Sequence, residues 1–176
     1  MSLNLQHPII YLITSGATQP ATGPASEEFR NVLALVRAAT QARISLIQLR
    51  ERNLPARTLY ELAVSCVEMT RGTPTRLLIN DRADIAYAAR ADGVHLTTRS
   101  IEAGIIRRTF GKDFLIGVST HSLIEAQGAR AGGADFAVFG PVFDTPSKRA
   151  YGPPVGIESL REVAKSLRPF PIIALG

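Results

Sequence analysis

Residues 44–82 of the chain read ISLIQLRERNLPARTLYELAVSCVEMTRGTPTRLLINDR. Two short apolar runs, Ile44–Arg50 and Arg76–Asp81, enclose a stretch whose apolar residues recur at the spacing of one helical face. A short run that is apolar on both faces is typical of a parallel strand covered on both sides, and a helix between two such strands makes a right-handed crossover. This stretch therefore predicts one strand–helix–strand unit of an α/β fold.

The same alternation extends over the whole chain. Seven strands are predicted, at Ile9–Thr14, Ile44–Arg50, Arg76–Asp81, Gly93–Thr97, Phe114–Thr120, Phe136–Gly140 and Pro171–Leu175. Between the first two, Phe29, Val32 and Val36 recur at the spacing of a helical face. Ser122 and Glu125 have the spacing of a capping box at the start of a later helix. Such a pattern is typical of a parallel sheet with helices between its strands.

Polar residues and glycines follow nearly every predicted strand. The clusters are Thr14-Ser15-Gly16, Gln48-Leu49-Arg50, Asn80-Asp81-Arg82, Ser119-Thr120-His121 and Gly140-Pro141. An open doubly wound sheet concentrates such residues at one switch point, whereas a closed eightfold barrel builds its site from the carboxyl ends of many strands. The sequence contains neither a GxGxxG motif nor a P-loop. We therefore predict the α/β fold of the (β/α)8 TIM barrel.

The length of 176 residues fits one domain with a substantial core. A (β/α)8 barrel usually needs about 200 residues or more. We therefore expect residues 1–176 to form a single barrel domain that is truncated after the seventh strand, with the eighth strand and its helix missing.

The composition indicates a globular protein of the cytoplasm. Hydrophobic residues make up 45% of the chain and charged residues 20%, which is ordinary for a folded domain. No apolar run approaches the roughly 18 residues that span a bilayer, and the first residues lack the pattern of a secretory signal. Cys66 is the one cysteine, so no disulfide can form within the chain and a reducing, cytoplasmic location is expected.

The net charge of +5 favours anionic partners. Because the basic residues are scattered, aromatic residues amount to 6% and tryptophan is absent, a surface that stacks nucleic-acid bases is disfavoured. We expect phosphorylated small molecules as substrates, no nucleic acid and no membrane as partners, and we leave a homodimer open.

Gln48, Arg50 and Arg52 alternate at the end of one predicted strand, so their side chains are expected to face the same way. Two guanidinium groups there can hold a diphosphate through bidentate, charge-assisted hydrogen bonds. The alternative is that the arginines form salt bridges with Glu51 or with surface carboxylates.

Asp81 follows the next predicted strand, where a carboxylate can bind Mg²⁺ together with phosphate oxygens and water. In the alternative interpretation, Asp81 caps the next helix or pairs with Arg82. His121 stands at another strand end, where a neutral imidazole can move a proton, or it can cap the following helix. His95 lies inside a short apolar run and is expected to be a packed, hydrogen-bonded histidine.

The connection from Gly140 to Gly156 is long for a link between a strand and a helix, and long loops in compact domains are commonly functional. It carries Thr145, Ser147 and Lys148, whose hydroxyl and ammonium groups suit a phosphate. A solvated basic loop is the alternative.

Five segments together resemble the family of thiamine phosphate synthases and the related thiazole tautomerases (TenI-like proteins). They are Gln48-Leu-Arg-Glu-Arg52, Leu78-Ile-Asn-Asp-Arg82, Ala91-Asp-Gly-Val-His-Leu96, Gly117-Val-Ser-Thr-His-Ser122 and Phe139-Gly-Pro-Val-Phe-Asp-Thr-Pro-Ser-Lys148. The resemblance implies a TIM barrel that joins an aminopyrimidine diphosphate to a thiazole phosphate in thiamine biosynthesis, with Mg²⁺ and with release of pyrophosphate.

The resemblance also implies roles for single residues. It implies catalytic roles for His121, Lys148 and Arg50, a Mg²⁺ ligand in Asp81, and substrate-binding roles for Gln48, Arg50, Arg52, Asn80, Ser119, Thr145, Ser147 and Lys148. Arg52 stands where the synthases usually have lysine. Ser100 stands where they have a second Mg²⁺ carboxylate, which weakens the expected metal site.

Three functions remain open at this stage. The first is a synthase-like transferase that works by charge stabilisation and positioning. The second is a metal-free thiazole phosphate tautomerase in which His121 carries the proton. The third is a regulator that binds a phosphorylated ligand without turnover.

Overall fold

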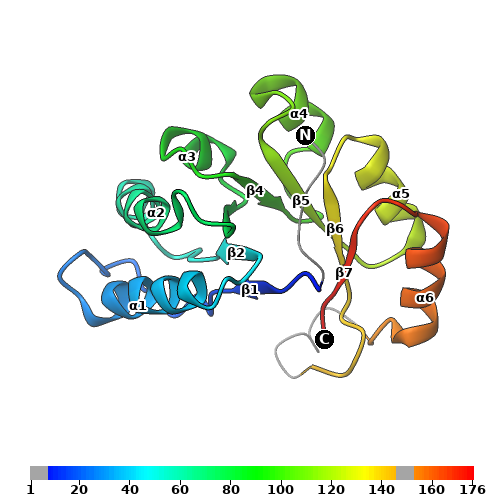
Figure 1. Cartoon of the computed structure of the whole chain (residues 1–176), viewed down its shortest axis with the longest axis horizontal. Helices are drawn as coiled ribbons and strands as arrows, with labels where there is room; N and C mark the ends of the chain where they lie inside the picture. The colour runs from blue at the N-terminus through cyan, green and yellow to red at the C-terminus, as the bar shows by residue number, and fades with distance from the viewer. Residues whose placement is uncertain (1–7, 146–152) are drawn as a thin grey trace. The chain divides into compact units, whose positions relative to one another are not determined.

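A computed structural model describes residues 8–145 and 153–176 of the protein (Figure 1). Strands and helices alternate along these residues, with seven strands from β1 to β7 and six helices from α1 to α6. These residues divide into two compact units, one that ends at residue 95 and one that begins at residue 96. No helix in the described ranges is both long enough and apolar enough to cross a bilayer.

In the first unit, four parallel strands are hydrogen-bonded to one another in chain order. Its elements are β1 (Tyr11–Ile13), α1 (Glu27–Gln41), β2 (Leu46–Leu49), α2 (Ala56–Thr70), β3 (Arg76–Asn80), α3 (Ala83–Ala88) and β4 (Gly93–Leu96). Figure 1 shows α1 and α2 side by side, and the two helices are in contact. Gln48 pairs with Ile13 and with Leu78, and Asn80 pairs with His95. The register therefore aligns the polar ends of these strands.

The second unit continues the same alternation. Its elements are α4 (Ala103–Phe110), β5 (Leu115–Thr120), α5 (Leu123–Ala131), β6 (Phe136–Phe139), α6 (Gly156–Ser166) and β7 (Ile172–Ala174). The three strands are parallel and pair in chain order. In Figure 1, α5 and α6 lie side by side, and they pack on β6 and β7 respectively. Phe139 and Val163 belong to the apolar cluster that joins these elements.

All seven predicted strands are present, but most are shorter than predicted. The first runs over Tyr11–Ile13 instead of Ile9–Thr14, and the second ends at Leu49. The third ends at Asn80 because Asp81 takes a left-handed backbone conformation, with φ at 60°, that no strand can continue. Gln48, Asn80 and Ser119 thus remain inside their strands, whereas Arg50, Asp81 and His121 stand just beyond them.

Burial follows the expected patterns. β2 is buried at all four positions, as expected of a strand covered on both faces. Phe29, Val32 and Val36 form the buried stripe of α1. Cys66 is fully buried in α2, and this burial raises the pKa of its thiol to about 12. Cys66 is therefore a core residue.

The capping box at the start of α5 is confirmed in part. The Ser122 hydroxyl accepts a hydrogen bond from the Glu125 amide at 3.2 Å, as the motif predicts. The Glu125 carboxylate, however, accepts from the amide of His121 at 2.6 Å, one residue before the cap. The glutamate thereby fixes the backbone at the end of β5.

A polar residue lies directly before each of β2, β4 and β6. Its side chain accepts a hydrogen bond from a backbone amide at the start of the neighbouring strand, β1, β3 or β5 respectively. The Ser45 hydroxyl accepts from the Ile10 amide at 3.3 Å. The Asp92 carboxylate accepts from the Leu77 amide at 2.8 Å, and the Asp135 carboxylate accepts from the Ile116 amide at 2.7 Å. These side chains satisfy backbone N–H groups at the amino ends of the strands, which stabilises the strand register there.

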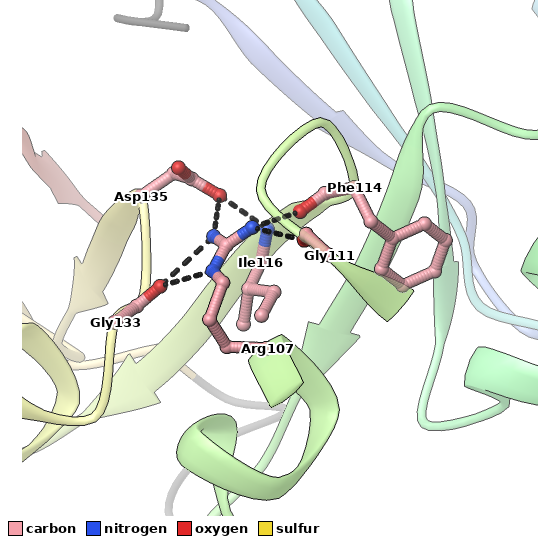
Figure 2. Close-up of polar contacts among 6 residues, drawn as sticks. All are labelled: Arg107, Gly111, Phe114, Ile116, Gly133 and Asp135. Atoms are coloured by element: carbon pink, nitrogen blue, oxygen red, sulfur yellow. Dashed lines mark hydrogen bonds and ion pairs between the residues drawn. The ribbon is translucent and has the colours of Figure 1, made fainter. Parts of the chain in front are cut away.

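Arg107 of α4 extends the bond network of Asp135 (Figure 2). Its guanidinium group donates to the Asp135 carboxylate at 2.7 Å and to the Gly133 carbonyl at 2.9 and 3.0 Å. It also donates to the carbonyls of Gly111 and Phe114, both at 2.8 Å. One side chain thus joins the end of α4, the start of β5 and the turn before β6.

We expect Arg107→Ala to lower the free energy of unfolding by about 2–4 kcal/mol, because it leaves a carboxylate and three carbonyls without their donor. Urea unfolding measures the change. Arg161→Ala is the control. The exposed fractions of the Arg161 and Glu158 side chains are 67% and 78%, so the loss of their ion pair is expected to cost less than about 0.5 kcal/mol. Equal losses in the two variants would contradict the structural role of Arg107.

Candidate functional site

Gln48 lies in a buried polar network at the carboxyl half of β2. Its side chain is 2% exposed and its amide nitrogen donates to the Tyr11 hydroxyl at 3.1 Å. The same hydroxyl lies 3.1 Å from Nδ1 of His95. Since the phenol oxygen accepts from Gln48, its own proton is available for His95. His95 is thus buried and hydrogen-bonded, as expected, and the network fixes which way the Gln48 amide points.

Tyr11 is a member of this network that the sequence analysis did not single out. Burial raises the pKa of the Tyr11 hydroxyl far above its usual range, an effect that the hydrogen bond from Gln48 partly opposes. The phenol therefore stays protonated and remains a donor. The available signal was a lone hydroxyl-bearing side chain in the otherwise apolar strand Tyr11–Ile13.

Arg50 and Arg52 follow β2 and are more exposed than Gln48. Arg50 is half-buried and its amide donates to the Thr14 hydroxyl at 2.8 Å, while Arg52 is exposed. The alternative of a salt bridge to Glu51 is wrong. Glu51 is 2% exposed, and among the described residues its carboxylate accepts hydrogen bonds from Gly16 and Thr18, not from either arginine.

Asn80 and Asp81 follow on the neighbouring strand. Asn80 is half-buried at the end of β3 and Asp81 is exposed just after it, with its amide donating to the His95 carbonyl at 2.9 Å. Asp81 does not cap the next helix, and its charge adds only the last of the contributions that raise the pKa of Arg82, of which the hydrogen bond to Asp84 is the first. Arg82 is engaged by Asp84 through bonds of 2.9 and 2.6 Å, which lower the pKa of the Asp84 carboxyl, and no side chain caps α3.

The residues present fit a Mg²⁺ ion only if the substrate supplies most of its ligands. The described part of the chain holds no group of three or more histidine, cysteine, aspartate or glutamate side chains suited to a metal. Ser100 closes a local turn, accepting from the Thr97 amide at 2.7 Å. One exposed carboxylate, that of Asp81, together with phosphate oxygens and water is an ordinary way for a protein to hold Mg²⁺.

In the second unit, His121 stands directly after β5. Its Nδ1 lies 2.5 Å from the Gly140 carbonyl oxygen, and because a carbonyl can only accept, Nδ1 carries the proton. Nε2 of the neutral ring is then an acceptor. The ring of His121 does not cap α5, since the Ser122 hydroxyl does. The imidazole is exposed and oriented, as a proton carrier requires.

Gly140 is required by close packing of two backbone segments. A side chain at this position would place its Cβ 2.2 Å from the Leu175 carbonyl oxygen. The Leu175 amide donates to the Phe139 carbonyl at 2.9 Å, which draws the segments together. The carbonyl that orients His121 is therefore itself held by β6 and β7.

A cavity of about 830 Å³ lies within the second unit, between α4 and α5. Its lining includes the hydroxyl-bearing residues Thr97, Thr98, Ser100 and Ser119 and the charged residues Arg107, Arg108 and Glu125. Ser119, half-buried in β5, is thus reached from this cavity.

The predicted site residues gather within each unit as follows. In the first, Gln48, Arg50 and Arg52 at the end of β2 adjoin Asn80 and Asp81 at the end of β3, since these strands are paired. In the second, Ser119 and His121 belong to the end of β5, and Thr145 follows β6, where its hydroxyl donates to the Phe143 carbonyl at 3.1 Å. Ser147 and Lys148 lie outside the described residues.

We expect Gly140→Ala to cost more than about 3 kcal/mol of unfolding free energy and to abolish activity, because the added Cβ must displace backbone. Gly128→Ala is the matched control. A Cβ at Gly128 of α5 meets nothing within 4 Å, so this variant is expected to gain up to about 1 kcal/mol. Thermal unfolding checks both, and a stable, active Gly140→Ala protein would contradict the packing described here.

The chain is similar in sequence to thiamine-phosphate synthases. Residues 11–176 match the family model for thiamine monophosphate synthase. The thiamine-phosphate synthase of Moorella thermoacetica is 40% identical over 147 residues, which cover 84% of this chain and 70% of that protein. The thiamine-phosphate synthase of Roseiflexus sp. is 36% identical over 168 residues, or 96% of this chain and 67% of that one.

A solved structure agrees with these sequence matches. The thiamine phosphate pyrophosphorylase from Pyrococcus furiosus is similar over 96% of this chain and 74% of its own, with a TM-score of 0.78 and 29% identity. Together the comparisons confirm the predicted family, the predicted (β/α)8 fold class and the prediction of a synthase-like transferase.

Proposed function

The chain belongs to the thiamine monophosphate synthase family, and on that premise we propose that it joins an aminopyrimidine diphosphate to a thiazole phosphate in thiamine biosynthesis. The bond between the pyrimidine methylene carbon and the diphosphate oxygen breaks, and its electron pair leaves with pyrophosphate. The thiazole nitrogen then forms the new bond to that carbon. Such a reaction needs stabilisation of the leaving anion and good positioning more than acid–base chemistry.

The observation that carries this proposal is the set of groups after β2 and β3. The Arg50 amide donates to Thr14 and Arg52 is exposed beside it, so the segment after β2 carries two guanidinium groups of the kind that bind a diphosphate. Asn80 lies on the adjacent strand with its side chain half-buried. We assign Gln48 and Asn80 to the pyrimidine and the two arginines to the diphosphate.

The phosphate of the thiazole is assigned to the second unit. Thr145 and Ser147 would bind it and Lys148 would neutralise the leaving pyrophosphate, with Ser119 contributing a hydroxyl. The support is the family motif that carries these residues. Ser119 and Thr145 are supported further by their placement after or at the ends of β5 and β6.

Asp81 would hold Mg²⁺, which supplies positive charge to the oxygens of the diphosphate when it is bound. The exposed carboxylate at the end of β3 supports this role. Because no cluster of three or more metal-binding side chains surrounds it in the described residues, the site would depend on the substrate's own oxygens. We also propose a cytoplasmic location and one barrel domain for residues 1–176; the single cysteine supports the first and the match of residues 11–176 to one family model supports the second.

The direct test is to incubate the protein with both substrates and to measure pyrophosphate and thiamine phosphate, with and without Mg²⁺. We expect both products in stoichiometric amounts and only with Mg²⁺. Absence of pyrophosphate under every condition would exclude the synthase reaction. Tight binding of thiamine phosphate without turnover would instead support a regulator.

Asp81→Asn keeps the size of the side chain and removes its charge. We expect kcat/KM to fall roughly a hundredfold and the Mg²⁺ concentration for half-maximal rate to rise, because the ion loses its one protein carboxylate. Asp113→Asn is the control: Asp113 is an exposed aspartate before β5, and its variant should stay within about twofold of the wild type. Equal effects would argue against a metal-binding role for Asp81.

A second candidate, thiazole phosphate tautomerisation, is favoured by one observation. The Gly140 carbonyl holds His121 in the form whose exposed Nε2 accepts a proton. If this reaction occurs, His121→Asn should slow the tautomerisation about a hundredfold without lowering synthase turnover comparably. Proton exchange at the thiazole phosphate, followed by NMR, measures it. An equal loss of both activities would show that His121 does not act as a tautomerase base.

A further inference from the structure

Glu51 is a buried carboxylate that the proposed reaction does not use. It stands between Arg50 and Arg52, yet only 2% of it is exposed, whereas Arg50 is half-buried and Arg52 is exposed. Burying a carboxylate costs free energy unless hydrogen bonds or cations compensate. Among the described residues no cation forms an ion pair with Glu51, so its compensation has to come from neutral donors.

Those donors come from the loop that follows β1. The Glu51 carboxylate accepts from the Gly16 amide at 3.3 Å and from the Thr18 amide at 3.3 Å. It also accepts from the Thr18 hydroxyl at 2.7 Å, and Thr18 is fully buried. A neighbouring side chain, Asn53, donates to the Thr18 carbonyl at 3.0 Å. The loop is thus fastened to the segment that carries both arginines.

The fastened loop lies directly against Arg50. Gly16 has φ at +75°, and a Cβ at this position would lie 3.1 Å from the Arg50 carbonyl oxygen and 3.6 Å from its Nη1. The Thr14 hydroxyl accepts from the Arg50 amide at 2.8 Å, and the Thr14 amide donates to the Gln48 carbonyl at 3.0 Å. The backbone of Arg50 is therefore held by Thr14, and Gly16 passes so close to its carbonyl that a larger residue there would press on it.

We propose that Glu51 is a positioning residue that holds the loop of residues 14–18 against Arg50 and so fixes the backbone from which the Arg50 guanidinium group reaches an incoming diphosphate. A guanidinium group carried on a fixed backbone loses less conformational entropy on binding than one on a mobile loop, which strengthens recognition of the anion. The choice of diphosphate as the anion rests on the proposed function. The contacts that fix Arg50 do not depend on it.

The proposal is tested by the affinity of the full-length protein for inorganic pyrophosphate, measured by calorimetry in the presence of Mg²⁺. Glu51→Ala removes all acceptors for the loop and should weaken pyrophosphate binding roughly tenfold or more. Glu51→Gln keeps one acceptor oxygen and should restore part of the affinity. Gly16→Ala, which disturbs Arg50 from the other side, should also weaken binding.

Asp92→Asn is the matched control. Asp92 is likewise a carboxylate of the first unit that accepts a backbone N–H, from Leu77 at 2.8 Å, but it precedes β4 and so lies at the opposite ends of the strands. This variant should lose stability and keep the wild-type affinity for pyrophosphate. Steady-state kinetics adds a second readout: the Glu51 variants should raise KM for the aminopyrimidine diphosphate and leave KM for the thiazole phosphate unchanged.

The outcomes separate this proposal from the proposed function. Weaker pyrophosphate binding in the Glu51 and Gly16 variants, with the Asp92 variant unaffected, supports the positioning role even if no thiamine phosphate is formed. Wild-type affinity in Glu51→Gln and Gly16→Ala overturns it even if the synthase reaction proceeds. An equal loss of affinity in Asp92→Asn, or a wild-type protein that does not bind pyrophosphate, also overturns it.

Discussion

The parallel register of β1 to β4 decides where the functional groups of the first unit lie. Gln48 pairs with Ile13 and Leu78, and Asn80 pairs with His95, so the polar residues of successive strands reach the same edge of the sheet. The strands have four or five residues at most, most of them apolar and buried. Since a slip of one residue would turn every side chain to the other face, burial of the apolar positions fixes the polar ones as well.

Beyond the last ladder bond the backbone is held by side chains instead. Thr14 binds the amide of Arg50, Glu51 binds the amides of Gly16 and Thr18, and the Gly140 carbonyl binds His121. Loop residues next to the strands would otherwise be free to move. These contacts tie them to the ends of the strands. Charge stabilisation depends on such preorganised groups, because reorientation during the reaction would consume the energy that they supply.

The sequence predicted the fold class and all seven strands because both depend on local periodicity, which a run such as Ile44–Arg50 displays by itself. It could not predict the partners of single polar groups. Glu51 binds Thr18, 33 residues earlier, and Tyr11 meets His95, 84 residues later. The pairing of Arg82 with Asp84 was missed for another reason. Arg82 has an aspartate on either side in the sequence, and their order alone does not say which of the two it binds.

Aspartates before a strand and aspartates after a strand differ in how their carboxylates are engaged. Asp92 and Asp135 precede strands, and each is engaged by a backbone amide and by an arginine. Asp81 follows a strand and is exposed, and within the described residues its charge acts only weakly on Arg82, whose hydrogen bonds go to Asp84. A carboxylate whose hydrogen bonds are all used within the protein stabilises it, whereas one that stays exposed can bind a cation. The end of the strand at which an aspartate stands therefore separates a stabilising residue from a candidate ligand.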